Sequence, residues 1–184
     1  MNVFAGHRAL WLHQFDQLGE TSIEQIAATA KNYAGADIVM VKAMDGLTWM
    51  SNFDSSPNAI SGLTKWRETV ARGAAAGVTV LPWVVSNHRT DAESHAALGS
   101  IVVVDLEPYP GFWSGAGVVR SEHSASAVNP WADLAAGVPV YLADLRAGGV
   151  TGLHVSIDPR AGAETALNVA AWAGSVDGLL PQVY

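Results

Sequence analysis

The stretch Ile101-Val102-Val103-Val104-Asp105-Leu106-Glu107-Pro108-Tyr109 decides the fold class. Its first half is a continuous run of β-branched residues, which is typical of a strand that is covered on both faces. The segment 37–42 (Asp-Ile-Val-Met-Val-Lys) has the same character. Strands buried on both sides belong to parallel sheets whose faces are covered by helices. The two segments therefore predict an α/β protein.

Working outward from this stretch, apolar strand patterns alternate with segments of helical periodicity. Further strands are predicted at 9–13, 78–85, 152–157 and 178–183, and helices at 22–33, 58–76, 90–98 and 161–173, with another helix starting over 130–136. No Gly-x-Gly-x-x-Gly or Gly-Lys-Ser/Thr loop follows the first strand, so an open nucleotide-binding sheet is disfavoured. We predict a TIM-type (β/α) barrel with about six βα units, forming a single domain over 1–184.

A complete eightfold barrel typically needs about 250 residues, and this chain has 184. The barrel is therefore expected to be truncated or incomplete, lacking its last two units. A partner chain or a further C-terminal segment would complete it.

Composition narrows the possible partners. The chain is 49% hydrophobic and carries 17 acidic against 10 basic residues, a formal net charge of −7, without a Lys/Arg cluster. This balance disfavours nucleic acid and anionic membrane surfaces. Cysteine is absent, and no apolar run approaches a membrane span or a signal peptide. We expect a neutral ligand and no cofactor, with extracellular or phage-associated action as one option for where the protein works.

The strongest chemical signal is the acid pair Asp105 and Glu107. Side chains at i and i+2 point to the same face of a strand, with Cα atoms about 7 Å apart. Repulsion and desolvation would raise the pKa of at least one carboxyl, as a glycosidase acid requires. The alternative is structural: Asp105 caps the following loop, and Glu107 pairs with Lys42 or Arg120.

Polar residues end every predicted strand, and strand carboxyl ends share one rim. From this rim we predict a substrate site made of Lys42, Asp45, Trp83, Tyr109, Gln182, Tyr184 and His13. The rim list further contains Gln14, Asp16, Ser86, Asn87, His88, His154, Ser156 and Asp158.

The tryptophans, Lys42 and the histidines can each be given more than one role. Sugar rings stack on indoles, and Trp83, Trp49 and Trp113 are placed to reach the rim. Trp66, Trp131 and Trp172 fit helix packing, and Trp11 fits the core. Lys42 would form a salt bridge with Glu107 or Asp45, or act as a Schiff-base or phosphate-binding lysine. His13, His88 and His154 with Asp158 are a weaker metal-site alternative, because no His pair has ligand spacing; no metal is expected.

Three motifs resemble the family 25 glycoside hydrolases, the lysozyme-type muramidases. They are Val104-Asp105-Leu106-Glu107, the segment 40–46 (Met-Val-Lys-Ala-Met-Asp-Gly) and 181–184 (Pro-Gln-Val-Tyr). The resemblance implies that Glu107 is the general acid, that Asp105 orients a substrate group such as an acetamido carbonyl, and that Gln182 and Tyr184 line the sugar site.

Two functions follow as expectations. The first is an O-glycosidase acting on a polysaccharide such as cell-wall glycan, with Glu107 and Asp105 as catalytic residues. The second is a non-catalytic barrel module that binds glycan or builds a larger assembly such as a phage particle. A metal-dependent hydrolase is a third hypothesis, which requires the histidines to converge on an ion.

Overall fold

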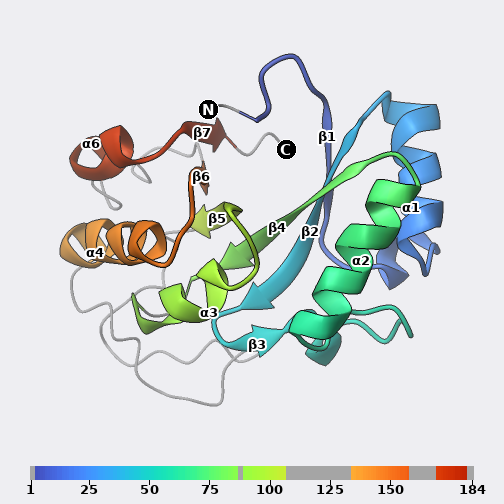
Figure 1. Cartoon of the computed structure of the whole chain (residues 1–184), viewed down its shortest axis with the longest axis horizontal. Coiled ribbons are helices and arrows are strands. Elements are labelled where there is room, and N and C mark those ends of the chain that lie inside the picture. Colours follow the sequence, from blue (N-terminus) through green and yellow to red (C-terminus); the bar gives the residue numbers. More distant parts are fainter. Residues whose placement is uncertain (1–2, 87–88, 107–133, 158–168, 182–184) are drawn as a thin grey trace. The chain divides into compact units, whose positions relative to one another are not determined.

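The computed structural model describes residues 3–86, 89–106, 134–157 and 169–181 (Figure 1). The chain forms two compact units. The N-terminal unit comprises Asn2–Met44 and Thr48–Trp83. The C-terminal unit comprises Met1, Asp45–Leu47 and Val84–Tyr184.

The sheet of the N-terminal unit is built on β2 (Ile38–Asp45), whose residues are all buried. Strand β1 (Ala9–Leu12) pairs with β2 in parallel, with Leu10 opposite Val39. Strand β4 (Thr79–Val85) lies on the other side of β2, and the two-residue β3 (Thr48–Trp49) pairs with β2 off this path. The apolar run of β2 is thus the centre of a parallel arrangement, as its composition predicts.

Two helices cover one side of these strands (Figure 1). Helix α1 (Ile23–Thr29) begins with a capping box between Ser22 and Gln25 and continues into a π-helical turn over Ala30–Ala34. Helix α2 (Leu63–Ala75) buries Trp66. A Cβ atom at Gly73 would lie 2.2 Å from Val80 Cγ2, so glycine is what lets α2 approach β4 this closely.

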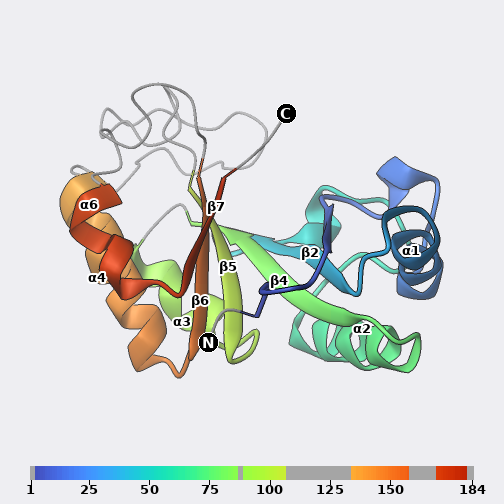
Figure 2. The same ribbon diagram turned by 90° about the horizontal axis from the view of Figure 1, so that it is seen from above.

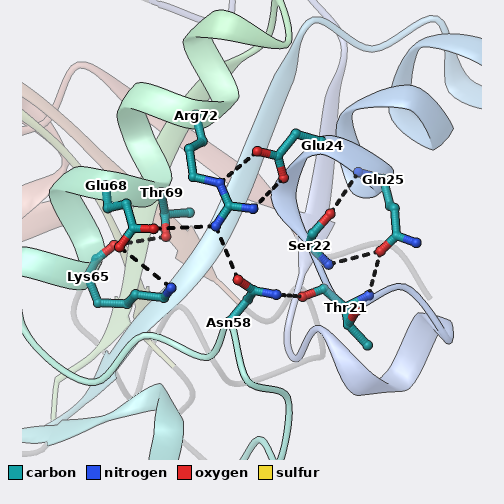
Figure 3. Close-up of polar contacts among 9 residues, drawn as sticks. All are labelled: Thr21, Ser22, Glu24, Gln25, Asn58, Lys65, Glu68, Thr69 and Arg72. Carbon is teal, nitrogen blue, oxygen red and sulfur yellow. Dashed lines mark hydrogen bonds and ion pairs between the residues drawn. The ribbon is translucent and has the colours of Figure 1, made fainter.

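An exposed polar network joins α1 to α2 (Figure 3). The Arg72 guanidinium makes a two-pronged ion pair with Glu24, at 2.6 and 2.7 Å, and donates to Asn58 Oδ1 at 3.1 Å. The Asn58 amide in turn donates to the Thr21 carbonyl at 2.5 Å. The hydrogen bond from Arg72 lowers the pKa of Glu24 to about 2. The network therefore ties the start of α1 to the last turn of α2.

The sheet of the C-terminal unit continues from the last residues of β4 through β5 (Ile101–Leu106) and β6 (Gly152–Ile157) to β7 (Gly178–Pro181). The β5–β6 and β6–β7 pairings are parallel. Helices α3 (Ala92–Ala96), α4 (Leu134–Ala147) and α6 (Val169–Trp172) lie on one side of β5, β6 and β7 (Figure 2). Four fully buried side chains form the inner face of α4: Val138, Tyr141, Leu142 and Leu145.

The predicted α/β class and the parallel sheet are confirmed, and each of the six predicted strands is present. Three local features differ from the prediction or go beyond it. Helix α2 begins at Leu63 rather than Asn58, because Gly62 at its N-cap is extended. Helix α4 runs to Ala147 and contains Pro139, whereas the sequence indicated only its start. The short strand β3 was not predicted.

No helix within the described ranges has the length and apolar character needed to cross a membrane.

Candidate functional site

Three residues of the predicted rim come together in the N-terminal unit. They are His13, which follows β1, Lys42 on β2 and Trp83 on β4. The Lys42 Nζ atom lies 3.5 Å from His13 Nε2 and 5.3 Å from the centre of the Trp83 ring. Lys42 and Trp83 are each 2% exposed, whereas His13 is half-buried. This set, together with Trp11, Gln14 and Phe53, is called the Lys42 cluster below.

Aromatic rings form the walls of the Lys42 cluster. The Phe53 ring also has its centre 5.3 Å from Lys42 Nζ, so two rings lie within cation–π range of the ammonium group. Trp83 stacks on Trp11 at 4.6 Å with a 32° tilt, and its indole N–H donates to the Leu12 carbonyl at 2.8 Å. Trp11, predicted as a core residue, is only half-buried. One indole of the stack is therefore fixed inside and the other reaches solvent.

Hydrogen bonds determine which nitrogen of His13 carries the proton. The Gln14 side-chain amide donates to the Phe53 carbonyl, so its other end, Oε1, faces His13 Nδ1 at 3.3 Å. An amide oxygen only accepts, and Nδ1 must therefore be the protonated nitrogen. The Nε2 lone pair then faces Lys42 Nζ. In this arrangement His13 Nδ1 donates to Gln14 Oε1, and Lys42 Nζ donates to His13 Nε2.

A loop that carries Phe53 is anchored to the segment after β1. The Asp54 carboxylate, 4% exposed, accepts hydrogen bonds from the Phe15 amide at 2.6 Å and from the Ser56 amide at 2.7 Å. Burial raises the pKa of Asp54. Next to it, Asp16 accepts from the backbone and hydroxyl of Ser55, at 3.1 and 2.9 Å. These contacts hold Phe53 in its place over the Lys42 ammonium.

The C-terminal unit holds a second buried polar group, around His95 on α3. His95 Nδ1 lies 2.6 Å from Tyr141 Oη, and Nε2 lies 2.8 Å from the Gly46 carbonyl. The carbonyl accepts, so Nε2 carries the proton and Nδ1 accepts from Tyr141. Burial lowers the pKa of His95 to about 4 and raises that of Tyr141 well above its usual range. His95 is thus held neutral. The predicted site residue Asp45, 1% exposed, lies close enough for its charge to favour the protonated form of His95.

Asp105, one member of the predicted acid pair, is 5% exposed on β5 and lies in register with Ser156 of β6. The other member, Glu107, lies outside the described residues, as do the predicted site residues Tyr109, Gln182 and Tyr184. The shared pocket of the acid pair therefore stays a prediction.

The structure gives no support to the metal alternative. The described residues contain no group of three or more His, Asp or Glu side chains that would hold an ion. His88 and Asp158, which that hypothesis required, lie outside the described part of the chain.

Sequence reasoning named His13, Gln14, Lys42 and Trp83 because each stands at, near or after the end of a predicted strand, although β2 in fact continues past Lys42 to Asp45. It missed Phe53, Asp54, His95 and Tyr141, which belong to a loop and to helices. For His95 one signal was available: His95 shares a helical face with Ala92, and both are buried. No local pattern marks Phe53.

No family model matches the chain, and no curated protein matches it. Among solved structures, the carboxyl transferase domain of Rhizobium etli pyruvate carboxylase is similar over 85% of this chain and 23% of its own, with 16% identity and a TM-score of 0.46. The Amycolatopsis orientalis BexX/CysO complex is similar over 94% of this chain and 57% of its own, with 13% identity and a TM-score of 0.40. The chain thus spans under two thirds of either.

These comparisons correct the resemblance to family 25 glycoside hydrolases. The family's model does not match, and the two structures just described are a carboxyl transferase and a BexX/CysO complex, not glycosidases. The identification as a lysozyme-like hydrolase is therefore wrong. The three motifs behind it are short, and buried parallel strands with polar ends produce such motifs in unrelated α/β proteins.

Proposed function

We propose that the chain is a non-catalytic binding module for a neutral glycan, with its site at the solvent-facing side of the Lys42 cluster. The observation that carries the proposal is the half-buried Trp11 indole, which packs at a 32° tilt against the buried Trp83. Sugars place their C–H faces on such rings and their hydroxyl groups on polar side chains at the ring edge.

The polar partners of that ring support the same ligand class. His13 and Gln14 follow the strand that carries Trp11, and both are half-buried, so a sugar on Trp11 would lie against their exposed edges. The formal net charge of −7 argues against a polyanionic glycan. We assign no bond cleavage to the chain, because the structure describes only one member of the expected acid pair, Asp105.

The architecture that presents this site is proposed to be a section of a (β/α) barrel. Five of the six predicted strands are followed by a helix. Strands β5, β6 and β7 are far apart in the sequence but pair side by side in parallel. A partner chain or a further segment would supply the closing strands. Strand pairing in a crystal structure of the protein checks this proposal.

Calorimetric titration of the chain with soluble oligosaccharides of glucose and of N-acetylhexosamine tests the binding function. Trp11→Ala is expected to weaken binding about tenfold or more, because a stacked aromatic pair contributes about 1 kcal/mol beyond the buried area of the ring itself. Trp49→Ala is the matched control, since Trp49 is another half-buried indole of the same unit.

Equal binding by the Trp11 and Trp49 variants would contradict the proposed site, and absence of binding to either sugar series would contradict the function. New reducing ends during the titration would show that the chain also cleaves the glycan and would overturn the non-catalytic assignment.

A further inference from the structure

Lys42 combines three features that the proposed glycan site does not use. Its side chain is 2% exposed, its Nζ faces the Nε2 lone pair of His13, and two aromatic rings lie over it. A nucleophile beside a base that is itself oriented by a third group is the general arrangement of covalent catalysis. Here Gln14 is the orienting group, since it accepts from His13 Nδ1.

We infer that Lys42 is a covalent site for aldehydes and ketones, at which His13 removes the ammonium proton and the freed amine forms a Schiff base. The inference goes beyond glycan binding and does not depend on it.

The step balances as follows. His13 Nε2 accepts one proton from the Lys42 ammonium, and the amine lone pair attacks the carbonyl carbon, forming a C–N bond. The carbonyl π electrons move to oxygen, which takes the proton back from His13 Nε2 to give a carbinolamine that still carries its positive charge on nitrogen. Loss of one water then leaves a protonated C=N bond. Lysine is the residue that forms such bonds in proteins.

The surroundings of Nζ suit the product as well as the reactant. The protonated imine is a cation at the position of the ammonium, so the rings of Phe53 and Trp83 retain their cation–π contacts with it. Because Lys42 is buried, few water molecules reach the C=N bond, which slows its hydrolysis.

The chain has its own reference groups for a test. Lys31 and Lys65 are its other two lysines: Lys31 is exposed and donates to the Ala76 carbonyl, and Lys65 pairs with Glu68 at 3.6 Å. Neither the Ala76 carbonyl nor Glu68 is a base held in place by a third group, as His13 is held by Gln14. Labelling at these two amines therefore measures ordinary surface reactivity in the same sample.

The experiment exposes the folded chain to glycolaldehyde for short times, reduces any imine with sodium borohydride, and locates the secondary amine by peptide mass spectrometry. Glycolaldehyde is a two-carbon aldehyde, chosen for its small size. Lys42 is expected to be labelled faster than Lys31 and Lys65. His13→Asn is expected to slow labelling at Lys42 about 100-fold, the lower end of the effect of a positioned base, and to leave the other two lysines unchanged.

Two more variants keep the test decisive. Lys42→Arg keeps the charge and the ring contacts but forms no imine, so the fast label should vanish. Gln14→Leu keeps His13 but removes the group that orients it, so labelling should slow even if the His13 variant folds poorly. Labelling at Lys42 no faster than at Lys31 and Lys65 overturns the inference, and so does fast labelling that neither the His13 nor the Gln14 variant reduces.

Discussion

The Lys42 cluster and the His95 group each place a histidine beside a second titratable side chain, but they differ in how the histidine is enclosed. Both ring nitrogens of His95 contact buried partners, Tyr141 and the Gly46 carbonyl, and its neutral form is enforced by burial. His13 is half-buried, and its Nε2 faces an amine. A histidine enclosed with both nitrogens bonded serves stability, whereas a half-exposed one that faces a nucleophile has chemistry left to do.

Removing each imidazole tests this difference, and the largest effect is expected at His95. His95→Ala removes one hydrogen bond of the Tyr141 hydroxyl, which also bonds to Ser86, and leaves the buried Gly46 carbonyl without its His95 donor, so the free energy of unfolding should fall by about 2–4 kcal/mol. His13→Ala should cost about 1 kcal/mol, because His13 is itself half-buried and the half-buried Gln14 can bond to water in its place. Urea denaturation of both variants measures the two losses. Similar losses would erase the distinction between the two histidines.

Acid should weaken the fold through His95. Its pKa is about 6.5 in the unfolded chain and about 4 in the fold, because burial disfavours the charged ring. The stability that comes from this group is complete above pH 6.5 and is lost as the pH falls toward 4, by about 3 kcal/mol in all. Burial also lowers the pKa of His154, which therefore contributes with the same sign.

Urea denaturation between pH 7 and pH 4 measures that loss, and His95→Asn is the comparison variant. The variant should show a shallower dependence on pH than the wild type, with the remainder due to His154 and other groups. An unchanged slope would mean that the pKa of His95 is the same in the fold as in the unfolded chain, in conflict with its enclosure.

The exposed polar network of Figure 3 provides a further test, in which the smallest loss of unfolding free energy is expected. Glu24 and Arg72 are 46% and 32% exposed in their side chains, so Glu24→Gln should cost under about 1 kcal/mol at neutral pH. The stability from Glu24 is present above its usual pKa of 4.5 and is lost as the pH falls toward about 2, because Arg72 favours the charged form.

Thermal and urea denaturation of Glu24→Gln check this value, and Glu68→Gln, which removes the longer ion pairs with Lys65 at 3.6 Å and Arg72 at 3.5 Å, is the control. A loss as large as that of His95→Ala would show that exposure does not separate the contributions of these polar groups.

Much of the fold follows from local patterns. The valines of β5 and the 37–42 segment of β2 predict buried parallel strands, and the Thr21, Ser22 and Gln25 pattern predicts the start of α1. The errors fall where tertiary contacts override local preference. Helix α4 continues through Pro139 because its apolar face is fully buried.

The candidate site was predictable only in part. Strand-end logic named His13, Lys42 and Trp83, since a parallel sheet brings strand carboxyl ends to one edge. It did not indicate Phe53, because a loop position depends on hydrogen bonds from residues about 40 positions away, such as Phe15 to Asp54. Nor did it indicate that Lys42 lies beside the His13 lone pair.

By itself, the sequence determined the class of fold and the kinds of side chain at the strand ends, because hydrophobic periodicity and strand alternation act over a few residues. Only the tertiary structure decided which of these side chains meet, which tautomer His13 adopts and which histidine is enclosed. Those outcomes depend on distances and hydrogen bonds between segments far apart in the chain, which no local pattern encodes.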